Sequence, residues 1–165
     1  MSTSTFVISY AHTVTYVTAK ILLTLKEIIR EIGLDPSKFI KDWETYEEAV
    51  STWIESGHFR KITLEVYDPR TNGLIRRWDM DVSYSTVGDG QVWVDTAAIR
   101  YAIAKAGFAP GHCLYDILVT NASGRPEVPG WQACEFRSTE GFKRYSVGAT
   151  TGGNGLHAQT AYWGR

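Results

Sequence analysis

The stretch FRKITLEVYDPRTNGLIRRWDMDVSY, residues 59–84, contains two runs in which apolar and polar side chains alternate, with a turn between them. The apolar positions are Ile62, Leu64 and Val66 in the first run and Leu74, Trp78, Met80, Val82 and Tyr84 in the second. A period of two predicts β-strands that bury one face and expose the other. Because Pro69, Asn72 and Gly73 supply turn residues between the runs, the stretch predicts a long antiparallel hairpin.

Two amphipathic helices precede this hairpin. From Tyr10 to Ile32 the apolar side chains recur every three or four residues, which predicts one long helix that ends at Gly33. A second helix is expected to follow Asp35 as N-cap, with Pro36 in its first turn, and to stop before Gly57. Two helices with such apolar faces need a broad surface to cover, and a sheet built on the hairpin provides one.

Further elements follow the hairpin and a loop at 85–91. A short helix is predicted from Asp95 or Thr96 to Gly107. CLYDILVT, 113–120, is apolar on both faces, which is typical of a central, covered strand. After a loop at 121–130, the segments 131–136 and 142–149 are predicted strands. We therefore expect a single α+β domain, residues 1–165, in which helices cover one face of a mostly antiparallel sheet.

Composition excludes several classes of protein. Seventeen basic and eighteen acidic side chains nearly cancel, so no basic surface for nucleic acid is visible. No apolar run approaches the roughly 20 residues of a membrane helix, and no secretion signal is seen, so we expect a cytoplasmic protein. Cys113 and Cys134 have no metal-binding neighbours in sequence and are expected to be small buried side chains in a reducing compartment.

Candidate catalytic or metal-binding residues are few. Asp79 and Asp81 lie on the wet face of the hairpin, where a solvated strand face is one interpretation and a divalent-metal site, as in a small transferase, is the alternative. The loop TTGGNG, 150–155, lacks the lysine and helix of a phosphate site. His12 and Asp116 are the titratable residues expected to be buried, in structural hydrogen bonds. No nucleophile motif occurs, so we predict no enzyme and no cofactor; a structural or assembly protein is the remaining alternative.

The segment GATTGGNGLHAQTAYWGR, 148–165, combines glycines with apolar and aromatic side chains. Glycines at 148, 152, 153 and 155 lower the cost of changing backbone conformation, so Gly148, Gly152, Gly153 and Gly155 suit a hinge. Leu156, Tyr162 and Trp163 offer apolar area to bury when the segment docks. This composition fits a mobile latch, and it equally fits a final strand that is permanently docked.

The order of elements and the texture of SYAHTVTYVTAKILLTLKEIIREIGLDPS, FIKDWETYEEAVSTWIESG and YSVGATTGGNGLHAQTAYWGR resemble the bacterial HORMA domains. The resemblance implies a switch that captures a closure-motif peptide, or a sister HORMA protein, as an added strand beneath a C-terminal safety belt. It also implies that the closed form binds and activates a cGAS-like nucleotidyltransferase in CBASS antiphage defence. An AAA+ remodelling ATPase would open it.

The resemblance assigns roles to particular residues as expectations. The safety belt would comprise about 131–165, with peptide or belt contacts at Tyr145, Val147, Leu156, His157, Tyr162 and Trp163 and the hinge at the four glycines. The first nine residues would be a flexible start at which the ATPase engages Ser2, Thr3, Ser4 and Thr5. The segment HAQTAYWGR is either belt or a closure motif for another protein.

Overall fold

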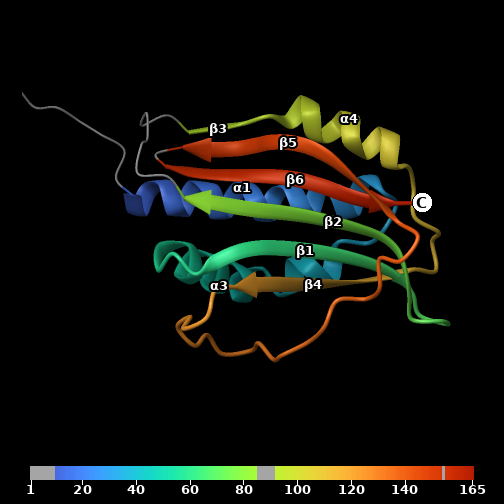
Figure 1. Cartoon of the computed structure of the whole chain (residues 1–165), viewed down its shortest axis with the longest axis horizontal. Coiled ribbons are helices and arrows are strands. Elements are labelled where there is room, and N and C mark those ends of the chain that lie inside the picture. Colours follow the sequence, from blue (N-terminus) through green and yellow to red (C-terminus); the bar gives the residue numbers. More distant parts are fainter. Residues whose placement is uncertain (1–9, 85–91, 154) are drawn as a thin grey trace, which may run out of the picture.

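The computed structural model describes residues 10–84, 92–153 and 155–165 (Figure 1). Its elements in chain order are α1 (Tyr10–Glu31), α2 (Ser37–Lys41), α3 (Trp43–Glu55), β1 (Phe59–Asp68), β2 (Gly73–Tyr84), β3 (Val92–Val94), α4 (Thr96–Ala106), β4 (Leu114–Asn121), β5 (Lys143–Gly153) and β6 (Leu156–Gly164). No helix among these is long and apolar enough to cross a membrane.

The six strands form one sheet in the order β3-β5-β6-β2-β1-β4, and every neighbouring pair is antiparallel. The predicted hairpin is its centre: β1 and β2 pair from Lys61 with Asp81 to Asp68 with Gly73. The hairpin of β5 and β6 adds to β2 on one side, and β4 adds to β1 on the other. The α+β prediction is confirmed.

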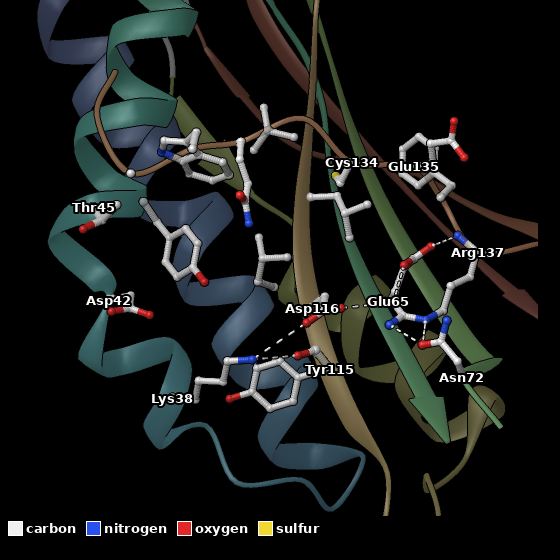
Figure 2. Close-up of a pocket in the computed structure, with 18 residues that line it drawn as sticks. Lys38, Asp42, Thr45, Glu65, Asn72, Tyr115, Asp116, Cys134, Glu135 and Arg137 are labelled. Carbon is white, nitrogen blue, oxygen red and sulfur yellow. Dashed lines mark hydrogen bonds and ion pairs between the residues drawn. The ribbon is translucent and has the colours of Figure 1, made fainter. Parts of the chain in front are cut away.

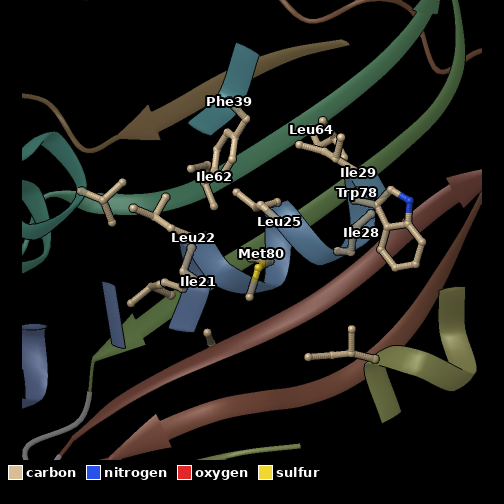
Figure 3. Packing of buried hydrophobic residues seen from close by; sticks show 14 of the residues in the cluster. Ile21, Leu22, Leu25, Ile28, Ile29, Phe39, Ile62, Leu64, Trp78 and Met80 are labelled. Carbon is tan, nitrogen blue, oxygen red and sulfur yellow. The ribbon is translucent and has the colours of Figure 1, made fainter. Parts of the chain in front are cut away.

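The core lies between the sheet and the helices, with α1 and α3 behind the sheet in Figure 1. Figure 3 shows Ile21, Leu25 and Ile28 of α1 against Trp78 and Met80 of β2, all of them fully buried. These α1 positions are the apolar stripe read from the sequence, and the β2 positions are the inward members of the alternation. Burial of each such side chain stabilises the fold by roughly 1.5–3 kcal/mol before the entropy of ordering is subtracted.

The ends of the helices follow the predicted capping chemistry, with two differences. Asp35 accepts the backbone N–H of Ser37 at 2.9 Å as expected, but Pro36 stands at the cap position itself. The predicted second helix is two helices, because the chain leaves helical geometry at Asp42 between α2 and α3. Asp95 caps α4 by accepting the N–H of Ala98 at 3.0 Å.

Two strand predictions are wrong. The segment 131–136 has no regular structure: Trp131 packs against the rings of Tyr46 and Trp53 on α3, and the segment pairs with no described strand. The apolar segment predicted at 113–120 corresponds to β4, Leu114–Asn121, which is at the edge of the sheet and pairs with β1 alone among the described strands. Apolar side chains of β4 line a groove beside the unpaired edge of the strand.

Candidate functional site: a groove along the free edge of β4

A groove of about 890 Å³ runs along the unpaired edge of β4. One wall is helical and contains Lys38, Asp42, Thr45 and Tyr46. The other wall is the segment 122–142, which we call the crossing segment; it connects β4 to β5 and contains no helix or strand. Figure 2 shows Lys38 and Asp42 on the helix side of β4 and Cys134 and Arg137 on the opposite side, so the strand edge lies between two unlike walls.

The direction of the β4 backbone can be read from one contact. Lys38 Nζ lies 3.4 Å from the carbonyl oxygen of Tyr115, which therefore points into the groove and away from β1. Because the N–H and C=O of one residue in a strand point to the same side and alternate with those of its neighbours, Ile117 and Val119 present theirs in the same direction. Three residues thus offer a row of backbone donors and acceptors to the groove.

The helical wall is aromatic at depth. Phe39 stacks on Tyr46 with ring centroids 5.0 Å apart, and Tyr46 meets the edge of Trp131 at 5.8 Å. Burial, and then the charge of Asp42, raises the pKa of Tyr46 to about 12, so its hydroxyl is neutral across the physiological range. Tyr115 closes one end: its hydroxyl donates to the carbonyl of Asp35 at 2.8 Å. The groove therefore offers apolar surface for side chains beside its polar strand edge.

The rim of the groove is acidic. Asp42, Asp116 and Glu135 line it together with the cations Lys38 and Arg137, and the buried Glu65 is paired with Arg137. Both cations contact Asp116, Lys38 at 3.8 Å and Arg137 at 3.1 Å. Asp42 and Glu135 form no ion pair within the described chain, so the groove carries uncompensated negative charge.

The crossing segment is held over the sheet at two places. Near its start, the indole N–H of Trp53 donates to the carbonyl of Pro126 at 2.7 Å, and Trp131 packs on the same indole. Near its end, Arg137 bonds to the buried carboxylate of Glu65 on β1, and Phe136 lies over the guanidinium of Arg77 on β2 at 4.2 Å. The segment thus passes from the free edge of β4 across the helix-free face to β5.

The six residues predicted as peptide or belt contacts do not line the groove; they hold the β5–β6 hairpin on the core. Leu156 and Tyr162 are buried, and the ring of Tyr162 lies between Trp78 and Tyr145, at 4.9 and 5.0 Å. Val147 is partly buried against the core, and His157 and Trp163 are half-buried on β6. These residues come together around β6, on the other side of the central hairpin from β4.

The four predicted hinge glycines shape the same hairpin. Gly148 adopts a left-handed φ of 95° beside a register shift in β5, and Gly155 adopts a φ of 87° next to β6. Gly152 pairs with His157 and Gly153 with Leu156 at the hairpin end. The predicted engagement residues Ser2, Thr3, Ser4 and Thr5 lie outside the described residues.

The interpretation of Asp79 and Asp81 as a solvated strand face is wrong for Asp79. Asp79 is 3% exposed, and its carboxylate accepts from Thr63 Oγ1 at 2.8 Å, Arg77 Nε at 2.9 Å and Trp163 Nε1 at 3.0 Å. Asp79 is thus buried and held by three protein donors, which is the environment of a structural carboxylate and not of a solvent-open metal ligand. Within the described ranges no group of three His, Cys, Asp or Glu side chains is arranged to hold a metal ion.

Sequence reasoning missed the buried charges at the site. Glu65 and Arg77 are buried, whereas His12 is exposed and the Asp116 side chain is 40% exposed in its ion pairs. Cys113 is buried as expected, but Cys134 is exposed beside the groove. Arg137 is the residue from which the sequence could have indicated a buried carboxylate. It follows an apolar stretch in a loop, and that loop has to cross a strand face carrying Thr63, Glu65 and Asp79.

The comparisons with known proteins agree on the fold. The family model described as Bacterial HORMA domain 2 matches residues 1–165. A search of curated proteins finds no match. Among solved structures, the C. elegans HTP-2 bound to the HIM-3 closure motif is similar with a TM-score of 0.75 at 11% identity, covering 99% of this chain and 98% of that chain.

Two further structures are similar. A chain of the mitotic checkpoint complex gives a TM-score of 0.75 at 12% identity, covering 92% of this chain and 98% of that chain. The CdnC:HORMA-deltaN complex of E. coli MS115-1 gives a TM-score of 0.57 at 14% identity, covering 98% and 90%. Likeness at such identities concerns the fold, and the family match spans the whole length given. The chain belongs to the bacterial HORMA domain family.

Proposed function

We propose that this protein is a non-enzymatic switch that captures a closure-motif peptide, or the corresponding segment of a sister HORMA protein, as a new strand on the free edge of β4. The observation that carries the proposal is the groove itself. It combines an unpaired strand edge, an apolar wall and a covering chain segment in one place. Strand addition to an exposed edge is a general mode of peptide recognition, in which the backbone supplies affinity and alternate side chains supply specificity.

The bound peptide has a defined arrangement in this proposal. Its backbone bonds to Tyr115, Ile117 and Val119, and each hydrogen bond contributes roughly 0.5–1.5 kcal/mol. Alternate side chains then face the aromatic wall at Tyr46 and Trp131, where apolar residues fit. The carboxylates of Asp42 and Glu135 favour lysine or arginine in the parts of the peptide near the rim.

The crossing segment and the β5–β6 hairpin together form the safety belt in this proposal. The crossing segment covers the peptide, while Leu156, Tyr162 and Trp163 hold the far end of the belt on β2. Tyr145, Val147 and His157 contribute to the same docking, and the four glycines of the hairpin permit it to change position when the ATPase opens the whole belt, a larger change than opening of the groove alone. A ligand that binds only the covered state shifts the population toward that state by its differential affinity.

The partners follow from the family and are proposed on that ground. One similar structure is a complex of a HORMA protein with CdnC, and we propose that the closed form of this chain binds and activates a cGAS-like nucleotidyltransferase in antiphage defence. An AAA+ remodelling ATPase would open the protein by engaging residues 2–5. All three proteins would meet in the cytoplasm.

Peptide selection on the purified protein tests the groove. Peptides from a displayed library should bind the wild type and lose at least about tenfold in affinity in Tyr46→Ala, since an aromatic wall residue of this size typically contributes more than 1 kcal/mol. Tyr101→Ala is the matched control, because Tyr101 is 65% exposed on α4, away from the groove. Peptides that bind both variants like the wild type would place recognition elsewhere.

Reconstitution tests the partner. Mixing the protein, a selected peptide and a CdnC-type nucleotidyltransferase should give a co-eluting complex and cyclic-nucleotide synthesis that depends on the peptide. Complex formation that ignores the peptide would contradict the switch. Asp79→Asn with Asp81→Asn should leave divalent-ion binding unchanged, whereas loss of a stoichiometric ion would favour the metal-dependent transferase.

A further inference from the structure

We infer that Arg137 is the clasp that fastens the crossing segment, and that the groove opens by release of Arg137 while the β5–β6 hairpin stays paired with β2. The effect on a bound peptide rests on the function proposed above. The clasp itself is a property of the free protein, because all of its contacts lie within this chain.

Arg137 makes an unusually dense set of contacts for a loop residue. Its backbone N–H donates to Glu65 Oε2 at 2.8 Å, and its Nη1 lies 2.8 Å from Glu65 Oε1. Nη1 also bonds to Asp116 at 3.1 Å, while Nε and Nη2 both bond to Asn72 Oδ1 at 3.2 and 2.9 Å. The guanidinium plane lies 3.6 Å from the ring centroid of Tyr67. One side chain thus ties the crossing segment to β1, β4 and the turn before β2, as Figure 2 shows for Glu65, Asn72 and Asp116.

Glu65, the ion-pair partner of Arg137, makes the contacts of Arg137 cooperative. The Glu65 side chain is fully buried, and Arg137 is its ion-pair partner in the described chain. A buried carboxylate that loses its partner carries a large desolvation cost, so release of Arg137 is opposed until water or another cation reaches Glu65. The contacts to Glu65, Asn72 and Asp116 therefore break together as one event.

The rest of the crossing segment is attached by side chains near its start, where Val128 and Trp131 pack on the core and Trp53 donates to the carbonyl of Pro126. Between Ser123 and Ser138 no backbone–backbone hydrogen bond joins it to the remaining described chain, and residues 132–136 are exposed. β6, in contrast, pairs with β2 along its length, from Arg77 with Trp163 to Tyr84 with Leu156. Loss of the clasp frees one short stretch, whereas detachment of the hairpin would break a full strand pair and expose Leu156 and Tyr162.

The clasp also touches the ligand-binding edge. Asp116, which belongs to β4, receives Nη1 of Arg137 from the crossing segment and lies 3.8 Å from Lys38 of α2. Besides the contact of Trp131 with Tyr46, the two walls of the groove therefore also meet through one carboxylate on its edge strand. Arg137 acts as a positioning residue for the peptide, because it fixes the distance between the crossing segment and β4 without belonging to the backbone row that the peptide would pair with.

Hydrogen exchange on the free protein tests this inference. In Glu65→Gln, the amide of residue 137, which donates to Glu65 Oε2 in the wild type, should exchange about tenfold faster or more, because loss of a hydrogen bond between charged groups changes an opening equilibrium by at least that factor. Arg137→Lys keeps the charge but loses the forked geometry, and should show the same effect to a smaller degree. Amides of α1 and β2 should keep their wild-type protection in both variants.

The matched control lies on the same segment. Glu127→Gln removes a 3.9 Å pair with Arg125 in which Glu127 is 91% exposed, and it should leave all amides unchanged. Unchanged exchange of the residue 137 amide in both clasp variants would overturn the inference, as would a parallel increase in α1 and β2, which would mean global destabilisation. A fluorescent peptide from the library selection should then dissociate about tenfold faster from Glu65→Gln. If no peptide binds at all, the proposed function fails while the exchange result still decides the clasp.

Discussion

The indole N–H of Trp163 on β6 donates to Oδ2 of Asp79 on β2 at 3.0 Å, while Thr63 and Arg77 bond to Oδ1 of the same carboxylate. The aromatic side chain near the end of β6 is therefore tied to the central hairpin through a buried charge. Tyr162 adds an aromatic contact with Trp78 from the neighbouring position. In this structure the β5–β6 hairpin is an integral part of the sheet, and the segment over the groove is the one that precedes it.

Asp79→Asn should lower the free energy of unfolding by roughly 3 kcal/mol, since it leaves Arg77 buried without its anion and places an amide N–H₂ among three donors. Asp81→Asn is the control: its side chain is 46% exposed and its pair with Arg144 is 3.9 Å long, so the change should stay within about 0.5 kcal/mol. Urea denaturation at neutral pH measures both. Equal effects of the two substitutions would contradict the assigned burial.

The stability of Asp81→Asn and that of the wild type should depend differently on pH. Burial, and then the charge of Asp79, raises the pKa of Asp81 above 3.8 in the folded wild type. In the window above 3.8 the folded protein binds more protons at Asp81 than the unfolded chain, so this residue lowers stability as pH rises through the window. Asp81→Asn removes that dependence. Its stability relative to wild type should therefore rise by a few tenths of a kcal/mol between about pH 4 and pH 7, and urea titrations at several pH values measure it. A fall in the stability of Asp81→Asn relative to the wild type over the same pH range would contradict the raised pKa of Asp81.

The sequence predicts most elements of this fold because helix and hairpin periodicity depend on local pattern. The stripe of α1 and the alternation from Ile62 to Val82 follow directly from which face is buried. The position of a strand in the sheet is a different kind of property. An apolar strand such as β4 can be covered by helices on both faces, or by helices on one face and a loop on the other, and composition does not distinguish these.

The candidate site could not be predicted for the same reason. The groove depends on Lys38 of α2, Tyr115 of β4 and Arg137 of the crossing segment meeting across the fold, and no short spacing links them. The glycines and aromatic residues of 148–165 were conspicuous in the sequence, but their contacts place them at the docked hairpin. The charge most important to the crossing segment, Glu65, stands at an outward position of an alternating strand, which normally indicates exposure to water.

Gly152→Ala should destabilise the hairpin end by about 1–3 kcal/mol, because an added Cβ would lie 2.9 Å from His157 Nδ1 and 3.0 Å from the carbonyl of Leu156. Gly111→Ala is the matched control: its φ is not left-handed and nothing lies within 4 Å of the added atom. Thermal unfolding should show a loss of roughly 2–4 °C per kcal/mol for the first variant and almost none for the second. A tolerated Gly152→Ala would mean that the hairpin end relaxes freely.

N-methylation of successive residues in a groove-binding peptide should reduce its affinity with a period of two. Amides that face β4 donate to the carbonyls of Tyr115, Ile117 or Val119, and methylation removes the donor and adds bulk at the edge. Each such position should lose about tenfold in affinity or more, while the intervening positions tolerate the methyl group. Fluorescence anisotropy with the methylated series measures this. Uniform tolerance along the peptide would contradict strand addition at β4.

Thiol labelling gives a direct readout of groove occupancy. Cys134 is exposed and lines the groove, whereas Cys113 is buried, and burial raises the pKa of its thiol further from neutrality. The thiolate is the reactive form, so an aromatic disulfide reagent such as DTNB should modify one thiol in the folded protein and both in urea. Cys134→Ser should abolish the native reaction, and Cys113→Ser should leave it unchanged. A saturating groove peptide should slow the reaction of Cys134 by about tenfold, because a strand on β4 lies between the thiol and solvent. A native reaction rate that ignores a tightly bound peptide would place that peptide outside the groove, and with it the strand-addition proposal would fail.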